Sequence, residues 1–183
     1  MKSVRKSARG PRSGPKTAKR KPNRAGMRNA TLYEKALALA DSSKPEWGEV
    51  FRLLSRAQEA GDPRAAYALA TWRLHGKEPY VKRDVKEAVR LLKIAADDGV
   101  PEALYDLAVC YQNGEGVREN DRKAFDLYLR AALKGEVDSV VEVARCLKYG
   151  RGVERNLLAS RAFLDHAADM SAGTPVIRVG YPQ

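Results

Sequence analysis

Apolar residues recur at the three- and four-residue spacing of amphipathic helices through most of the chain. Residues 63–75 and 101–113 both place alanine and leucine on one face of a helix, and residues 85–96 do so with leucine, valine and alanine. A glycine follows each of the first two segments, as is common just beyond a helix end. The pattern therefore predicts an all-α fold built from short helices.

The helical pattern repeats along the chain. Val81, Val117 and Val153 are each 36 residues apart, and the loop after Gly76 is two residues longer than the loop after Gly114. Further positions keep the same register: Leu91, Leu127 and Phe163; Ala95, Ala131 and Ala167; Ala96, Ala132 and Ala168. Such self-similarity is typical of stacked repeats, in which each unit buries its apolar face against the next.

Each unit is predicted to be a hairpin of two helices. The first helix has Pro63 in its first turn and Gly76 just past its end, which suits the two termini of a helix. The second helix begins at a recurring capping position: Asp84, Asn120 and Asn156. Upstream, residues 31–40 and 46–60 have the pattern of a further helix pair. We therefore expect about four stacked hairpins.

The central unit carries a family resemblance. It reads Ala103-x3-Leu107-Ala108-x2-Tyr111-x2-Gly114-x-Gly116-Val117, followed by Lys123-Ala124, Ala131-Ala132 and Gly135. This pattern resembles the Sel1-like repeat, a relative of the tetratricopeptide repeat, over roughly residues 47–170. The resemblance implies a right-handed α/α superhelical solenoid, assigned here to residues 30–170, that acts as an adaptor for protein complexes. Bacterial members include immunity proteins and regulators.

Positive charge is concentrated in the first 29 residues. The chain has 34 Lys and Arg and 23 Asp and Glu, but residues 1–29 hold 11 of the basic residues and no acidic one. Rich in proline and glycine and without aromatic residues, this segment is predicted to be a disordered basic tail. RNA, DNA or an anionic membrane surface could bind it by charge alone, and a solubilising terminus is the alternative. The candidate polyanion-binding residues are Lys16, Lys19, Arg20, Lys21, Arg24 and Arg28.

Several classes of protein are not expected. The longest uninterrupted apolar run, residues 65–70, is far shorter than the roughly 20 residues of a membrane-spanning helix. The N-terminus lacks the hydrophobic stretch of a secretory signal, and two cysteines are too few for a disulfide scaffold. We therefore expect a cytoplasmic protein.

No catalytic, cofactor or metal site is predicted. Gly114-x-Gly116 follows a helix and lacks the strand, lysine and Ser or Thr of a phosphate-binding loop. His75 and His166 have no partner at metal-ligand spacing. Cys110 and Cys146 occupy the same repeat position as Trp72, which indicates a core position, although an exposed thiol of low pKa would be reactive. We therefore expect a protein that is not an enzyme.

The first helix of each unit leaves one stripe free of core positions, and in repeat solenoids the first helices line the concave face where partners bind. The candidate partner-binding residues are Arg64, Tyr67, Thr71, Leu74, Glu102, Tyr105, Val109, Gln112, Asp138, Val141, Arg145 and Lys148. The two tyrosines could anchor a partner or pack between repeats. A non-enzymatic scaffold for a protein or peptide partner is the leading hypothesis. The alternative is a nucleic-acid-associated protein whose tail binds RNA or DNA while the repeats recruit a partner.

The last segment, residues 171–183, leaves the repeat pattern. It is bounded by proline and glycine, which disfavour a helix, yet it contains Val176, Ile177, Val179 and Tyr181. We expect an extended segment that covers the open end of the last hairpin, with docking on a partner as the alternative.

Overall fold

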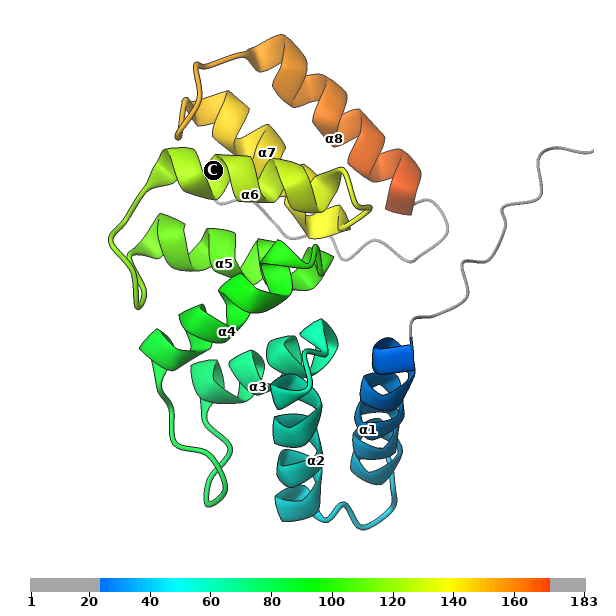
Figure 1. Ribbon diagram of the computed structural model, residues 1–183. Helices are drawn as coiled ribbons and strands as arrows, with labels where there is room; N and C mark the ends of the chain where they lie inside the picture. The colour runs from blue at the N-terminus through cyan, green and yellow to red at the C-terminus, as the bar shows by residue number, and fades with distance from the viewer. Residues whose placement is uncertain (1–23, 172–183) are drawn as a thin grey trace, which may run out of the picture.

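The computed structural model describes residues 24–171, with side chains from residue 32 onward. Within this range the chain forms eight helices that stack from one end of the molecule to the other (Figure 1). They are α1 (Arg24–Ala40), α2 (Trp47–Glu59), α3 (Pro63–His75), α4 (Val85–Asp97), α5 (Pro101–Asn113), α6 (Asp121–Ala132), α7 (Val137–Tyr149) and α8 (Leu157–Ser171). Consecutive helices pack in pairs to form four hairpins. The predicted all-α solenoid is therefore confirmed.

The first helix begins earlier than the sequence pattern indicated. α1 starts at Arg24, whereas the predicted helix started at residue 31, so the tail assigned to residues 1–29 overlaps α1. No proline lies between Arg24 and Ala40, and the backbone hydrogen bonds can therefore continue upstream. Arg24 and Arg28 thus belong to α1. The predictions for Lys16, Lys19, Arg20 and Lys21, and for residues 172–183, lie outside the described residues.

The helix boundaries follow from the capping residues that the sequence identified. The Oδ1 atoms of Asp84, Asn120 and Asn156 each accept a hydrogen bond from a backbone N–H three residues later, at 2.9 to 3.0 Å. At the ends of α5 and α7, Gly114 and Gly150 adopt the left-handed conformation with φ of 70° and 73°. The second helices therefore start, and the first helices stop, where local chemistry requires.

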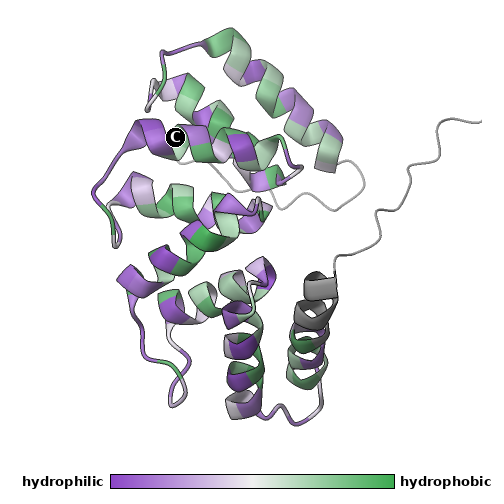
Figure 2. Cartoon of the chain, viewed as in Figure 1, coloured by the Kyte–Doolittle hydropathy of each residue, from purple (hydrophilic) through white to green (hydrophobic). Residues whose placement is uncertain are grey.

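The core is a continuous layer of small and branched apolar residues between hairpins. Hydrophobic and hydrophilic residues alternate along the helices (Figure 2). Ala65, Ala103 and Ser139 occupy one repeat position and are fully buried. Residues of this size let neighbouring helices approach closely. Ser139 differs from its alanine counterparts because its buried hydroxyl has no hydrogen-bond partner in the described part of the chain.

The second glycine of each Gly-x-Gly-Val loop lies directly against the preceding hairpin. A Cβ atom on Gly116 would come within 2.8 Å of the Val85 carbonyl oxygen, and one on Gly152 would overlap the Asp121 carbonyl oxygen. Val85 and Asp121 are the first residues of α4 and α6. Each loop therefore packs backbone against backbone on the start of the previous second helix.

This contact predicts different costs for two glycines of one loop. Gly150 and Gly152 have nearly equal positive φ angles. A Cβ atom on Gly152 would overlap the Asp121 carbonyl of the preceding hairpin, whereas a Cβ atom on Gly150 would have only ordinary contacts of 3.5 Å or more. We expect Gly150→Ala to cost about 1 to 2 kcal/mol of unfolding free energy from backbone strain alone. Gly152→Ala should cost roughly 1 to 3 kcal/mol more, because the loop must move away from α6. Urea unfolding of both variants would measure this difference, and equal costs would contradict the backbone contact.

Candidate partner-binding surface

The twelve predicted partner-binding residues share one exposed stripe on α3, α5 and α7, called the first-helix face below. Arg64, Glu102, Asp138 and Lys148 are exposed, and the other eight are half-buried. None of the twelve belongs to the buried core. The face is therefore accessible along three successive hairpins.

Tyr67 is held at the junction of the first two of these hairpins. Its side chain interacts electrostatically with the carboxyl group of Asp106 on α5. Burial raises the pKa of Tyr67 to about 12, and burial also raises the pKa of Asp106. The tyrosine ring thus remains half-buried and neutral while it links α3 to α5.

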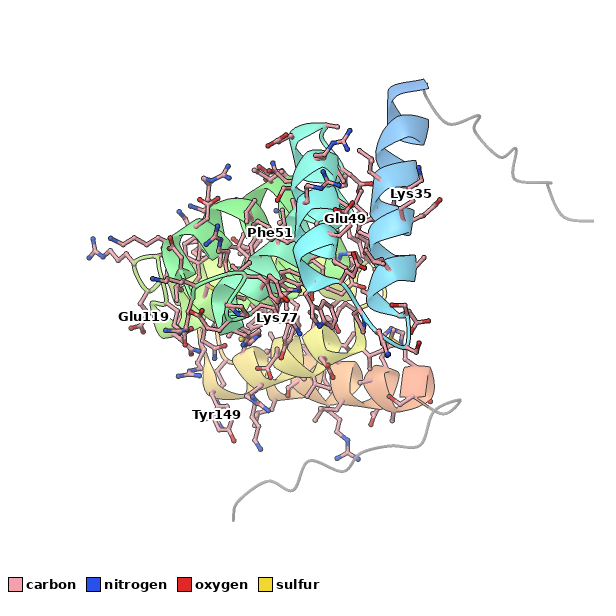
Figure 3. All side chains as sticks on the ribbon, turned by 90° about the horizontal axis from the view of Figure 1, so that it is seen from below. Lys35, Glu49, Phe51, Lys77, Glu119 and Tyr149 are labelled. Atoms are coloured by element: carbon pink, nitrogen blue, oxygen red, sulfur yellow. The ribbon has the colours of Figure 1, made fainter. Side chains whose placement is uncertain are left out.

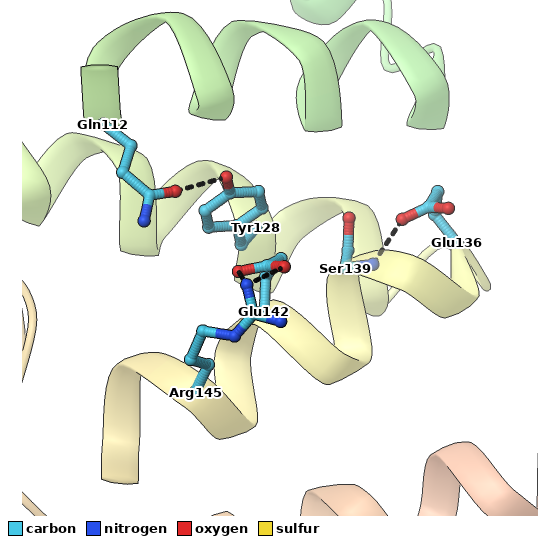
Figure 4. A network of polar contacts seen from close by, with 6 residues as sticks. All are labelled: Gln112, Tyr128, Glu136, Ser139, Glu142 and Arg145. Carbon is cyan, nitrogen blue, oxygen red and sulfur yellow. Dashed lines mark hydrogen bonds and ion pairs between the residues drawn. The ribbon is translucent and has the colours of Figure 1, made fainter. Parts of the chain in front are cut away.

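Tyr105 is supported from behind by a second tyrosine. Its ring centroid lies 5.6 Å from that of Tyr128, whose hydroxyl donates a 2.7 Å hydrogen bond to the Gln112 side chain (Figure 4). Tyr128 is fully buried, whereas Tyr105 is half-buried. Each of Tyr67 and Tyr105 thus both packs against a neighbour and presents part of its ring to solvent.

The sequence analysis missed one repeat position beside these tyrosines, which is polar in two of the three helices. It directly follows the position of Tyr67, Tyr105 and Val141, and it is occupied by Ala68 in α3, Asp106 in α5 and Glu142 in α7. Glu142 binds Arg145 at 2.8 Å (Figure 4), and burial raises the pKa of its carboxyl group. The sequence does mark this position, because in each case a carboxylate residue directly precedes a core residue: Asp106 precedes Leu107, and Glu142 precedes Val143.

Negative charge predominates where α5 and α7 begin. Arg64 is paired with Asp62 at 2.9 Å and Arg145 with Glu142, so neither cation is free to balance other groups. Glu102, Glu136 and Asp138 lie around these helix starts. Burial raises the pKa of the Tyr105 hydroxyl, and the carboxylates of Glu142, Asp138 and Glu136 raise it further. Carboxylates therefore set the electrostatic environment of the Tyr105 hydroxyl, in the middle of the first-helix face.

A small cleft opens beside this surface between α3 and α5. It has a volume of about 320 Å³, with Leu74, Val109 and Cys110 among its apolar lining residues. Its polar lining residues are His75, Arg83, Asp106 and Glu115. Arg83 is held in place because its Nε donates a 2.8 Å hydrogen bond to the carbonyl of Leu74. The cleft can accept one side chain of a bound segment, with an apolar stem and a polar end.

The residues considered for chemistry lie in structural positions. Cys110 and Cys146 are buried and unpaired, and burial raises the pKa of each thiol to about 11. Both are therefore neutral at physiological pH, as expected for core residues. Within residues 24–171 no group of three His, Cys, Asp or Glu side chains could hold a metal ion. No helix in this range is long and apolar enough to cross a membrane.

Comparison with known proteins agrees with this architecture. The family model described as the Sel1 repeat matches residues 63–100, 101–136 and 137–171. A crystal structure of a Sel1 repeat protein from Oxalobacter formigenes is similar, with a TM-score of 0.69 and 26% identity over 78% of this chain and 41% of that chain.

Two relatives contain a similar sequence within longer chains. The F-box protein At1g67340 of Arabidopsis thaliana is 34% identical over 139 residues, 74% of this chain and 35% of the relative. Chitin synthase regulatory factor 2 of Schizosaccharomyces pombe is 40% identical over 92 residues, 46% of this chain and 18% of the relative. This chain therefore spans about a third or less of the length of these relatives.

The raised pKa of Asp106 predicts a pH-dependent effect of one substitution. The folded state holds the Asp106 proton more tightly than the unfolded chain does, so this group's contribution to stability is lost as pH rises through its raised pKa. Asp106→Asn removes the charge of this half-buried side chain and keeps an oxygen atom at the same position. We expect a higher Tm than that of the parent protein at pH 7 and an equal Tm at pH 3, where both side chains are neutral.

Circular dichroism melts at the two pH values would measure this effect. Asp126→Asn, at an exposed position of α6, is the matched control and should leave the Tm within about 1 to 2 °C at both pH values. A lower Tm for Asp106→Asn at pH 7 would show instead that the ionised carboxylate stabilises the junction.

Proposed function

The chain belongs to the Sel1 repeat family, and we propose on that premise that it is a non-enzymatic scaffold that binds a protein partner. The first-helix face of α3, α5 and α7 is the proposed binding surface (Figure 1). The observation that carries this proposal is the row of exposed and half-buried residues on three successive hairpins. Repeat solenoids use such extended surfaces to bind partners.

The proposed partner presents an extended basic segment. Glu102, Glu136 and Asp138 provide negative charge along the face, and electrostatic complementarity favours a cationic segment. Tyr67 and Tyr105 offer ring edges on preformed supports, which reduces the entropy that is lost on binding. The adjacent cleft would take one Lys or Arg side chain, whose aliphatic stem fits apolar walls and whose cation approaches Asp106.

The relatives support an adaptor role in outline. One is named an F-box protein and another a chitin synthase regulatory factor, and in each the matching residues are a minor part of a longer chain. A repeat domain carried by proteins of such different names is suited to binding rather than to one reaction. The proposed location is the cytoplasm, where buried and unpaired thiols such as Cys110 and Cys146 persist.

Charge reversal on the first-helix face tests this function. We expect Glu102→Lys with Asp138→Lys to weaken binding of a fluorescent 12-residue peptide that contains four arginines by about tenfold, because attraction becomes repulsion. The control is Glu119→Lys with Glu154→Lys, two exposed loop positions with the same change in net charge. Fluorescence anisotropy of both variants and the parent would measure the affinities.

Two outcomes would contradict the proposed surface. One is equal loss of affinity in both variants, which would show that only net charge matters. The other is equal parent affinity for a matched peptide with four glutamates in place of the arginines.

A second candidate function rests on the separation of charge along the chain. Because the first 29 residues hold 11 basic residues and no acidic one, a nucleic-acid-associated role for the tail remains our alternative proposal. In this case the tail would supply affinity for RNA or DNA, and the repeats would recruit the protein partner.

Salt dependence tests this alternative. We expect the full chain to bind a 20-nucleotide single-stranded RNA, with the affinity falling at least about tenfold between 50 and 200 mM salt. A variant that lacks residues 1–23 keeps α1 and should lose this binding. Binding that ignores salt, or that survives the deletion, would contradict a role for the tail.

A further inference from the structure

The last hairpin leaves open the face that its predecessors bury. In α4 and α6, Leu92 and Tyr128 occupy one repeat position beneath the next hairpin and are 0% and 1% exposed. The same position in α8 is Leu164, which is 37% exposed. The apolar layer therefore continues to the last described hairpin, where no described helix covers it.

The last hairpin also exposes other large apolar side chains. In the described part of the chain, four of the seven exposed large apolar residues are Tyr149, Leu157, Leu158 and Leu164. Tyr149 points away from the body of the molecule (Figure 3), and Leu158 replaces the exposed Lys86 and Arg122 of earlier units. We call these four residues the end face.

A shallow apolar pocket adjoins the end face between α7 and α8. It has a volume of about 90 Å³ and is lined by Val141, Ala144, Arg145, Lys148, Tyr149, Ser160 and Leu164. Val141, Arg145 and Lys148 also belong to the first-helix face, so the pocket lies where that face meets the end of the stack. In the preceding hairpin the equivalent space is occupied by Tyr128, whose ring centroid lies 5.6 Å from that of Tyr105 and whose hydroxyl donates a hydrogen bond to Gln112. Leu164 and Val141 replace Tyr128 and Tyr105 in the last hairpin, and these smaller side chains leave the pocket unfilled.

We propose that residues 172–183 of this chain occupy the end face and that their apolar side chains cover Leu164 and the pocket. The segment continues directly from Ser171, the last residue of α8, and contains Val176, Ile177, Val179 and Tyr181. Pro175 and Gly180 disfavour a helix, so an extended course suits this sequence. Its single cation, Arg178, leaves the segment otherwise uncharged.

The length of the segment matches the length of the open face. Fifteen residues of α8 rise about 22 Å at 1.5 Å per residue. The twelve residues after Ser171 can extend up to about 40 Å, which is enough to return along α8 to Leu157 and Tyr149. A tethered segment also has an effective concentration on the order of millimolar, so it outcompetes a second copy of the chain at micromolar concentration.

Hydrogen exchange of α8 tests the proposal. We expect a chain truncated after Ser171 to show about tenfold faster amide exchange in α8 and a Tm lower by several degrees, because the end face loses its cover. Val176→Ser, Ile177→Ser and Val179→Ser together should have the same effect at unchanged length. Thr174→Ser with Arg178→Gln is the control and should leave exchange and Tm at parent values.

The remaining arms of the experiment identify the occupant. A synthetic peptide of residues 172–183, added to the truncated chain, should slow α8 exchange again. Equal exchange in the truncated and full chains would overturn the proposal. So would a full-chain dimer in light scattering that Leu164→Glu dissociates, since a second copy would then occupy the end face. None of these readouts depends on binding at the first-helix face.

Discussion

The close approach of consecutive hairpins is the constraint on which the rest of the structure depends. Gly116 and Gly152 bring the loop backbone against the first residues of α4 and α6, where a side chain would not fit. Ala103 and its fully buried counterparts allow similar proximity along the helices. Because each unit contacts the one before it in the same way, a short local motif generates a regular stack.

The same constraint leaves the first-helix face, the proposed binding surface, outside the contacts between hairpins. Once the second helix of each hairpin packs on the first helix of the next, one stripe of α3, α5 and α7 remains outside the apolar layer. Tyr67 and Tyr105 lie along this stripe and are held by Asp106 and Tyr128, which belong to the scaffold. The surface is therefore preorganised by contacts that also stabilise the solenoid.

Cysteine and carboxylate side chains that could be reactive elsewhere are buried or half-buried between the helices of this solenoid. Burial keeps the thiols of Cys110 and Cys146 protonated. Ionisable side chains that are retained at the hairpin junctions, such as Asp106 and Glu142, shape the electrostatic field of the first-helix face. This arrangement agrees with the proposed role in binding a partner through shape and charge.

Sequence alone determined the helices, their caps and their stacking order. The capping residues Asp84 and Asn120 and the glycines at helix ends act on backbone groups only a few residues away along the chain. The 36-residue period indicates directly that the hairpins stack in chain order. The sequence pattern placed the start of the first helix at residue 31 instead of Arg24, because no residue between Arg24 and Thr31 identifies the N-terminus of the helix.

Only the tertiary structure decided which polar residues matter at the candidate site. The sequence pattern did not identify Asp106 and Glu142, because their effects depend on interactions with other side chains. Asp106 interacts with Tyr67 of the preceding hairpin, and Glu142 pairs with Arg145 one helical turn away. Likewise, the repeat pattern predicted an open end at the last hairpin, but the exposure of Leu164 there depends on how α7 and α8 pack. Burial and electrostatic fields are sums over neighbours in space, so a linear pattern specifies them incompletely.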